Sequence, residues 1–175
     1  AFHGDVYKNL DAASLDRSDC NWAQDNLLIL SGLYGCLRPF DAIQPYRLEM
    51  GTKWGLAPQP NLYTFWQDRI TQYLNAHIAK QHLPFIINLS SNEYGKVVNR
   101  KQLAVPMLDI VFKEQRPDGL KTIGLMAKRA RGAMARYLIQ QRSCKSLEAI
   151  QQFSQGYRFS SNLSKDNSLV FLSQK

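Results

Sequence analysis

The 175-residue sequence lacks several features, and each absence excludes a class of protein. It contains no run of eighteen apolar residues and no recognisable secretory signal, so we expect neither a transmembrane helix nor export. Three scattered cysteines form no C-x-x-C pair, which suits a reducing cytoplasm, and three histidines form no metal-binding set. A Walker loop, a G-x-S-x-G elbow, an H-E-x-x-H helix and a two-metal carboxylate cluster are absent as well. The sequence thus argues against a familiar nuclease or NTPase, without excluding a new enzyme.

Positive charge, in contrast, is abundant and unevenly distributed. The formal net charge is +8, and residues 96–145 hold 12 Lys and Arg against 3 Asp and Glu. Residues 1–95 hold 7 against 9. Such asymmetry is typical of a protein that binds nucleic acid or an anionic surface. We do not expect a membrane surface, because the apolar face of the most basic helix carries alanines and lacks the bulky residues of an interfacial anchor.

Much of this charge lies in one predicted helix that contains residues 128–136. At about 100° per residue, its apolar residues gather on one side. The other side carries the basic residues Lys128, Arg129, Arg131, Arg136 and Arg142. Gly132 lies near the centre of this basic face, where a missing side chain leaves a notch that a phosphate or a second backbone could approach. Because the donor fork of arginine suits phosphate, the face predicts a polyanion-binding surface, with a merely solvated basic face as the alternative.

The remaining sequence alternates helix and strand signals. Helices are predicted from Ser18 or Asp19 to about Leu30 and over residues 62–78, with a short capped turn at Ser90–Glu93. Strands are predicted over residues 85–89, as a hairpin of 104–112 with 120–127, and as a pair of 156–159 with 169–172. The pattern predicts a single α+β domain over residues 1–175, with antiparallel strands and helices around the sheet. The chain begins without Met and, as we interpret it, in mid-strand, so we expect a fragment of something longer.

A glycine-containing turn over Leu30–Gly35 offers a second possible contact with phosphate. It has the form of a helix-hairpin-helix turn, in which backbone N–H groups face a DNA phosphate and the following helix adds its dipole. Its candidate DNA-binding residues are Gly32, Leu33, Tyr34 and Gly35, with Arg38 as a nearby cation. A plain glycine-terminated helix is the alternative.

Polar residues also gather where an enzyme could place its site. The irregular segment after Pro39 is dense in them, up to Trp54, and Glu93 follows a predicted strand end. A general base beside arginines would suit chemistry on a nucleotide, but Arg47 and Glu49 could equally form a structural ion pair. The candidate cleft residues are Asp5, Arg47, Glu49, Lys53, Glu93, Tyr94 and Lys96.

Seven motifs, in the same order along the chain, resemble the YaaA peroxide-stress family. They are Phe2–Tyr7, Leu30–Pro39, Pro45–Gly51, Leu62–Trp66, Ile87–Tyr94, Ala127–Met134 and Gly156-Tyr157. The resemblance implies a bacterial DNA-binding protein linked to protection from hydrogen peroxide, with a basic cleft, a helix-hairpin-helix element and an unusual mixed fold. It implies no catalytic residue set. Two departures are the missing N-terminal segment with its Ser-Pro-Ala-Lys-Thr stretch, and His3 where family members carry lysine.

We therefore predict a cytoplasmic protein that binds duplex or branched DNA largely through phosphate contacts and takes part in peroxide defence, without a cofactor or metal. Readout of base edges is not expected, since no Asn, Gln and Arg set is evidently placed for it. The first alternative is an enzyme acting on a nucleotide or nucleic acid in the cleft, and the second is control of free iron. The sequence leaves the oligomeric state and the choice between DNA and RNA open.

Overall fold

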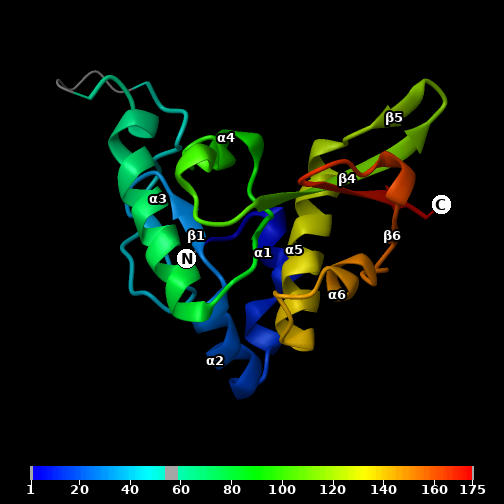
Figure 1. Ribbon diagram of the computed structural model, residues 1–175, viewed down its shortest axis with the longest axis horizontal. Coiled ribbons are helices and arrows are strands. Elements are labelled where there is room, and N and C mark those ends of the chain that lie inside the picture. The colour runs from blue at the N-terminus through cyan, green and yellow to red at the C-terminus, as the bar shows by residue number, and fades with distance from the viewer. Residues whose placement is uncertain (1, 54–58, 175) are drawn as a thin grey trace. The chain divides into compact units, whose positions relative to one another are not determined.

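The computed structural model describes residues 2–53 and 59–174, which form two compact units. Unit 1 comprises residues 24–107, and unit 2 combines residues 2–23 with the chain from 108 onward. Helices and strands alternate along the chain (Figure 1), which confirms the predicted α+β class. Helix α2 (Arg17–Asn26) carries the chain from unit 2 into unit 1.

The long helix α3 (Leu62–Gln81) is the centre of unit 1. The side chain of Asn61 caps it by accepting a hydrogen bond from the Thr64 N–H group at 3.0 Å. Its buried residues repeat at helical spacing, which confirms the predicted helix over 62–78. Three of them pack into a hydrophobic core whose members are Met50, Leu62, Ile70, Leu74, Val97, Val98 and Met107.

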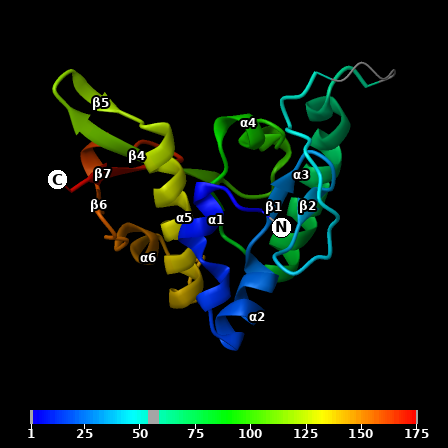
Figure 2. The same ribbon diagram turned by 180° about the vertical axis from the view of Figure 1, so that it is seen from behind.

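A short β-hairpin lies beside α3 (Figure 2). It consists of β1 (Ile29–Ser31) and β2 (Gly35–Leu37), paired antiparallel. The predicted helix to Leu30 was therefore wrong at its end, because α2 stops at Asn26. The helix-hairpin-helix interpretation of Leu30–Gly35 was wrong too, since this turn joins two strands. A short apolar run such as 27–30 suits a helix or a strand equally well, so its periodicity did not separate them.

The second half of unit 1 contains β3 (Ile86–Asn88), the short helix α4 (Asn92–Gly95) and the 3-10 turn η2 (Arg100–Gln102). The predicted strand over 85–89 is confirmed. The predicted cap at Ser90 was wrong by one residue: Ser91 accepts the Tyr94 N–H bond, whereas the Ser90 hydroxyl donates to Asn88 at 2.7 Å. Ser90 prefers this bond because Asn88 ends the strand with its side-chain oxygen close by.

The sheet of unit 2 contains β4 (Met107–Arg116), β5 (Gly119–Lys121), β6 (Tyr157–Phe159) and β7 (Ser168–Ser173). Both predicted antiparallel pairs are present, β4 with β5 and β6 with β7, although β5 ends at Lys121. Strands β4 and β7 also pair in parallel, which was not predicted. Phe112 packs against Phe153 and Phe171 at ring distances of 6.0 and 5.6 Å in the core of this unit.

The helices of unit 2 are α1 (Asp5–Leu10), α5 (Gly124–Gln141) and α6 (Leu147–Gln151), with 3-10 turns η1 (Ala12–Ser14) and η3 (Ser161–Leu163). The expected start in mid-strand was wrong, because α1 begins at Asp5. Both views show α1 lying along α5, the blue ribbon against the yellow one (Figures 1 and 2). The predicted basic helix is confirmed as α5.

Candidate nucleic-acid interface

The basic side of α5 meets acidic groups of its own unit. Arg129 lies 3.7 Å from Asp5, and Arg142 lies 3.5 Å from Asp19. Asp5, predicted as a cleft residue, thus has an ion-pair partner within unit 2. Folding therefore offsets part of the charge that the sequence places on this helix, and only what remains is available to an outside anion.

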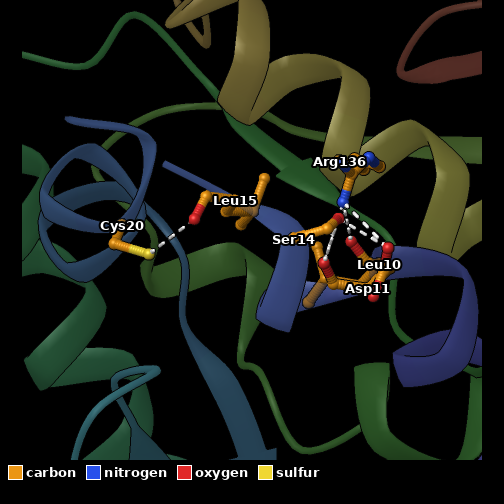
Figure 3. Close-up of polar contacts among 6 residues, drawn as sticks. All are labelled: Leu10, Asp11, Ser14, Leu15, Cys20 and Arg136. Carbon is orange, nitrogen blue, oxygen red and sulfur yellow. Dashed lines mark hydrogen bonds and ion pairs between the residues drawn. The ribbon is translucent and has the colours of Figure 1, made fainter. Parts of the chain in front are cut away.

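Arg136 binds the C-terminal end of α1 (Figure 3). Its Nη1 atom donates to the carbonyl oxygens of Leu10 at 3.0 Å and Asp11 at 2.8 Å. Carbonyl groups at a helix C-terminus have no intrahelical donor and carry partial negative charge, so a guanidinium stabilises them. The Arg136 side chain is only 21% exposed. This residue therefore holds α1 in place, and its Nη1 is engaged.

Gly132 is buried against α1. A β-carbon at this position would lie 2.1 Å from the Val6 carbonyl oxygen and 2.9 Å from the Asn9 β-carbon. The sequence leaves two possible occupants for the space beside Gly132, a phosphate or a second backbone. In the structure, the backbone of α1 occupies it. A phosphate has no access to Gly132 in this arrangement.

The two glycines of the β1–β2 turn also serve close packing. A β-carbon on Gly32 would lie 2.4 Å from the Leu48 carbonyl oxygen, and one on Gly35 would lie 2.6 Å from the Trp66 ring. Gly35 has φ +76°, a conformation that favours glycine. The Trp66 indole N–H donates to the Gly32 carbonyl at 2.9 Å. The space beside Gly32 and Gly35 is thus filled by Leu48 and Trp66, and these glycines do not form a phosphate-binding loop.

The other predicted residues of the turn differ in exposure. Leu33 is 43% exposed. The Tyr34 ring packs edge-on against Tyr46 at 5.5 Å. Arg38 is exposed but pairs with Asp41 at 3.2 Å. This turn presents one paired cation, which gives it less electrostatic attraction for DNA than the sequence indicated.

Sequence reasoning missed Ser31 and Trp66 as the residues that organise this turn. Ser31 is fully buried, and its hydroxyl lies 2.5 Å from the Tyr46 hydroxyl and accepts the Tyr34 N–H bond. Trp66 bonds to Gly32 across 34 positions of the chain. No local pattern signals such contacts, because partners this far apart meet only after α3 has packed.

Most of the cations of residues 96–145 nevertheless stay at the surface. The exposed ones are Lys96, Arg100, Lys101, Lys121, Lys128, Arg129, Arg142 and Lys145. Of the acidic residues in the same range, Glu114 is buried beside Arg116, and only Asp118 is exposed. The excess of positive charge in this range is thus an excess at the surface. The basic cleft itself stays a prediction.

The polar residues considered for catalysis are brought together in part. Glu93 accepts the Gly51 N–H bond at 2.8 Å. Burial, then the nearby Glu93, Tyr46 and Glu49, raise the pKa of Tyr94, against a hydrogen bond from the Met50 backbone that lowers it. These contacts show α4 holding the segment 46–51, a structural task. Arg47, Lys53 and Lys96 are exposed, and Trp54 lies outside the described residues.

The described cysteines Cys36 and Cys144 have thiols with raised pKa values. Burial, followed by the charge of Asp41, raises the pKa of Cys36 to about 12, and burial raises the pKa of Cys144. The described residues contain no group of three or more His, Cys, Asp or Glu side chains placed to hold a metal ion. Within residues 2–53 and 59–174, no helix is long and apolar enough to cross a membrane.

Together, these observations define an α+β protein in which most cations of residues 96–145 are exposed. The chain belongs to the family of the peroxide stress protein YaaA, whose model matches residues 1–163. It is 50% identical to a UPF0246 protein of Legionella pneumophila strain Lens over 172 residues, 98% of this chain and 66% of the relative. UPF0246 proteins of Francisella tularensis strain WY96-3418 and Bordetella petrii are each 47% identical, over 97% and 98% of this chain and 66% and 67% of theirs. The chain thus spans about two thirds of the length of these relatives.

Proposed function

We propose that this protein binds DNA through the phosphate backbone and that this binding is its part in the response to peroxide stress. The observation that carries the proposal is the surface excess of cations in residues 96–145, where eight Lys and Arg side chains are exposed and three of them, Lys121, Arg129 and Arg142, have a carboxylate within 4 Å. Neutralising phosphates releases condensed counterions, and this release drives binding without regard to sequence. Membership of the peroxide stress family supplies the link to stress.

The first turns of α5 favour the same ligand. Ile123 at the N-cap provides no side-chain acceptor, and the first turn has no acidic residue. The positive end of the helix is therefore not offset locally, and Lys128 and Arg129 follow it within two turns. We expect these two exposed cations of α5 to contribute contacts with DNA phosphates.

The test is the salt dependence of binding to two unrelated duplexes by the whole chain. Affinity should fall by about 0.9 log units per log unit of salt for each phosphate neutralised, and equally for both duplexes. The double variant Lys128→Gln with Arg129→Gln should reduce the slope by about two such contacts. The control is Arg158→Gln with Lys165→Gln, which removes the same charge from exposed positions outside residues 96–145. A flat salt response, or an equal loss in the control, would overturn the proposal.

A further inference from the structure

Arg131 differs from the other arginines of α5. Arg129, Arg136 and Arg142 each lie within 4 Å of a carboxylate. Arg131 has no such partner among the described residues, and its Nε atom is buried there without a hydrogen-bond acceptor. Burial alone lowers the pKa of Arg131. A partly desolvated guanidinium without a compensating anion is unfavourable, and a ligand of opposite charge removes that penalty.

Helix geometry explains why no acid of α1 serves this residue. Gly132 faces α1, and Arg136 binds its C-terminal carbonyl groups. At about 100° per residue, Arg131 points about 100° away from Gly132 and about 140° away from Arg136. The acidic residues of α1 and its C-cap, Asp5 and Asp11, pair with Arg129 and Arg136 instead.

Lys128 lies one turn before Arg131 on the same side of α5. Residues three apart on a helix are neighbours at its surface, so an anion at Arg131 has a second cation within reach. Lys128 is exposed, and Arg131 is partly exposed, so the pair lies where the helix surface meets solvent. The planar donor fork of arginine suits the oxygens of a phosphate, and lysine adds a point charge.

We propose that Arg131, supported by Lys128, forms a discrete site for one phosphate group. The site deepens the proposed function, because a phosphate of the DNA backbone is one source of this ligand. A free phosphorylated small molecule, such as a nucleoside monophosphate, is the other source. The site differs from diffuse attraction in that it is saturable and depends on one side chain.

The first experiment uses inorganic phosphate as the probe and thermal unfolding of the whole chain as the readout. Phosphate should raise Tm in a saturable way relative to chloride of equal ionic strength, because a ligand that binds only the folded state stabilises it. Arg131→Met keeps the apolar stem and should abolish this rise, whereas Arg131→Lys should retain part of it. In the absence of phosphate, Arg131→Met should have a Tm equal to or above that of the wild type, since it removes an uncompensated cation.

Arg158→Met is the control, because it removes an exposed arginine of unit 2 that lies outside residues 96–145. It should keep the response to phosphate. A wild-type protein without that response would overturn the site. An Arg131→Met variant that still responds to phosphate would also overturn the site. So would an Arg131→Met variant with a lower Tm than the wild type in the absence of phosphate, because that loss would show that Arg131 has a stabilising partner within the protein.

The second experiment distinguishes a phosphate of the DNA backbone from a free phosphorylated small molecule as the ligand. If the ligand is a DNA phosphate, Arg131→Met should weaken duplex binding by about tenfold or more, the size expected for a charge-assisted hydrogen bond. If the ligand is a small molecule, AMP should raise Tm as inorganic phosphate does while duplex affinity stays unchanged in Arg131→Met. A wild type that responds to phosphate but binds no duplex would support the site and overturn the proposed DNA-binding function.

Discussion

Gly132 allows the backbones of α1 and α5 to approach each other in unit 2. Its neighbours on α1 are the Val6 carbonyl and the side chain of Asn9, both closer than a β-carbon tolerates. Gly32 has the same role in unit 1, where the Leu48 carbonyl lies against it. At these two positions the residue type is determined by space, whatever ligand the surface around them binds.

Gly132→Ala should destabilise the protein by about 1–3 kcal/mol, because the methyl group overpacks the contact with α1. This cost outweighs the gain of about 0.5–1 kcal/mol that alanine brings to a helix interior. Urea unfolding measures the difference. Gly124→Ala is the control: nothing lies within 4 Å of a β-carbon there, so its stability should be unchanged or slightly higher. A Gly132→Ala variant as stable as the Gly124 control would contradict the packing account.

The thiol of Cys36 should resist hydrogen peroxide in the native protein. Its pKa is raised to about 12, chiefly by burial, and the thiolate is the reactive form. Because the folded-state pKa is the higher one, the neutral thiol stabilises the fold below the ordinary pKa of 9.0, and this contribution is lost as the pH rises from there through about 12.

Mass spectrometry after peroxide treatment at pH 7.5 provides the readout for Cys36. The thiol should stay reduced in the native protein and become oxidised in the same protein unfolded by urea. Oxidation of native Cys36 as fast as in urea would show that the thiol is ionised and accessible.

At the scale of elements, α4 holds the irregular segment 46–51 against unit 1. Glu93 binds the Gly51 N–H group, Tyr94 receives a hydrogen bond from the Met50 backbone, and Met50 is fully buried in the core. A segment without helix or strand needs such side-chain partners, because its own backbone groups pair little with each other. The two carboxylates considered as a general base thus differ: Glu93 has a structural contact, and Glu49 is exposed.

Glu93→Ala should release the Gly51 amide, and its hydrogen exchange should become about tenfold faster, as expected for loss of a charge-assisted bond. Glu93→Gln keeps an acceptor and should show a smaller effect. Glu49→Gln is the control and should leave the Gly51 amide unchanged. Duplex affinity should be the same in all three folded variants. A metal-independent turnover that disappears in Glu49→Gln would favour the enzyme alternative instead.

At the scale of the whole molecule, each unit has a core of its own. Unit 1 is contiguous in sequence and buries α3 against Met50, Val97 and Met107. Unit 2 is discontinuous, since α1 comes from the beginning of the chain and α5 from its second half. The predicted single domain over 1–175 is testable as one cooperative unfolding transition of the whole chain.

A fragment of residues 24–107 should fold alone, with a cooperative thermal transition in circular dichroism, because its core is complete within that range. A fragment of residues 108–175 should fold poorly, because Gly132 and Arg136 would lack α1 as a partner. Adding a peptide of residues 1–23 should restore its helical signal. An unfolded 24–107 fragment, or a stable 108–175 fragment without the peptide, would contradict the division into two units.

The sequence by itself determined the features that depend on neighbours in the chain. The spacing of apolar residues predicted α3 and α5, and the turn at Arg116–Gly119 predicted the β4–β5 hairpin. The excess of Lys and Arg over Asp and Glu in residues 96–145 follows directly from the sequence, and most of these Lys and Arg side chains are exposed in the structure. The motif resemblance identified the family that the comparison then showed. These properties are local, so a window of a few to twenty residues contains their cause.

Only the tertiary structure decided which of the basic residues are available. The helix pattern treats Arg129, Arg131 and Arg136 alike, but Arg136 binds α1, Arg129 pairs with Asp5, and Arg131 has no partner among the described residues. The same holds for Gly132, whose notch receives a backbone that lies more than a hundred residues earlier in the chain. The physical reason is that the availability of a charged side chain, or of the space beside a glycine, depends on the residues that pack against it. Those residues come from distant segments of the chain and are brought together only by folding.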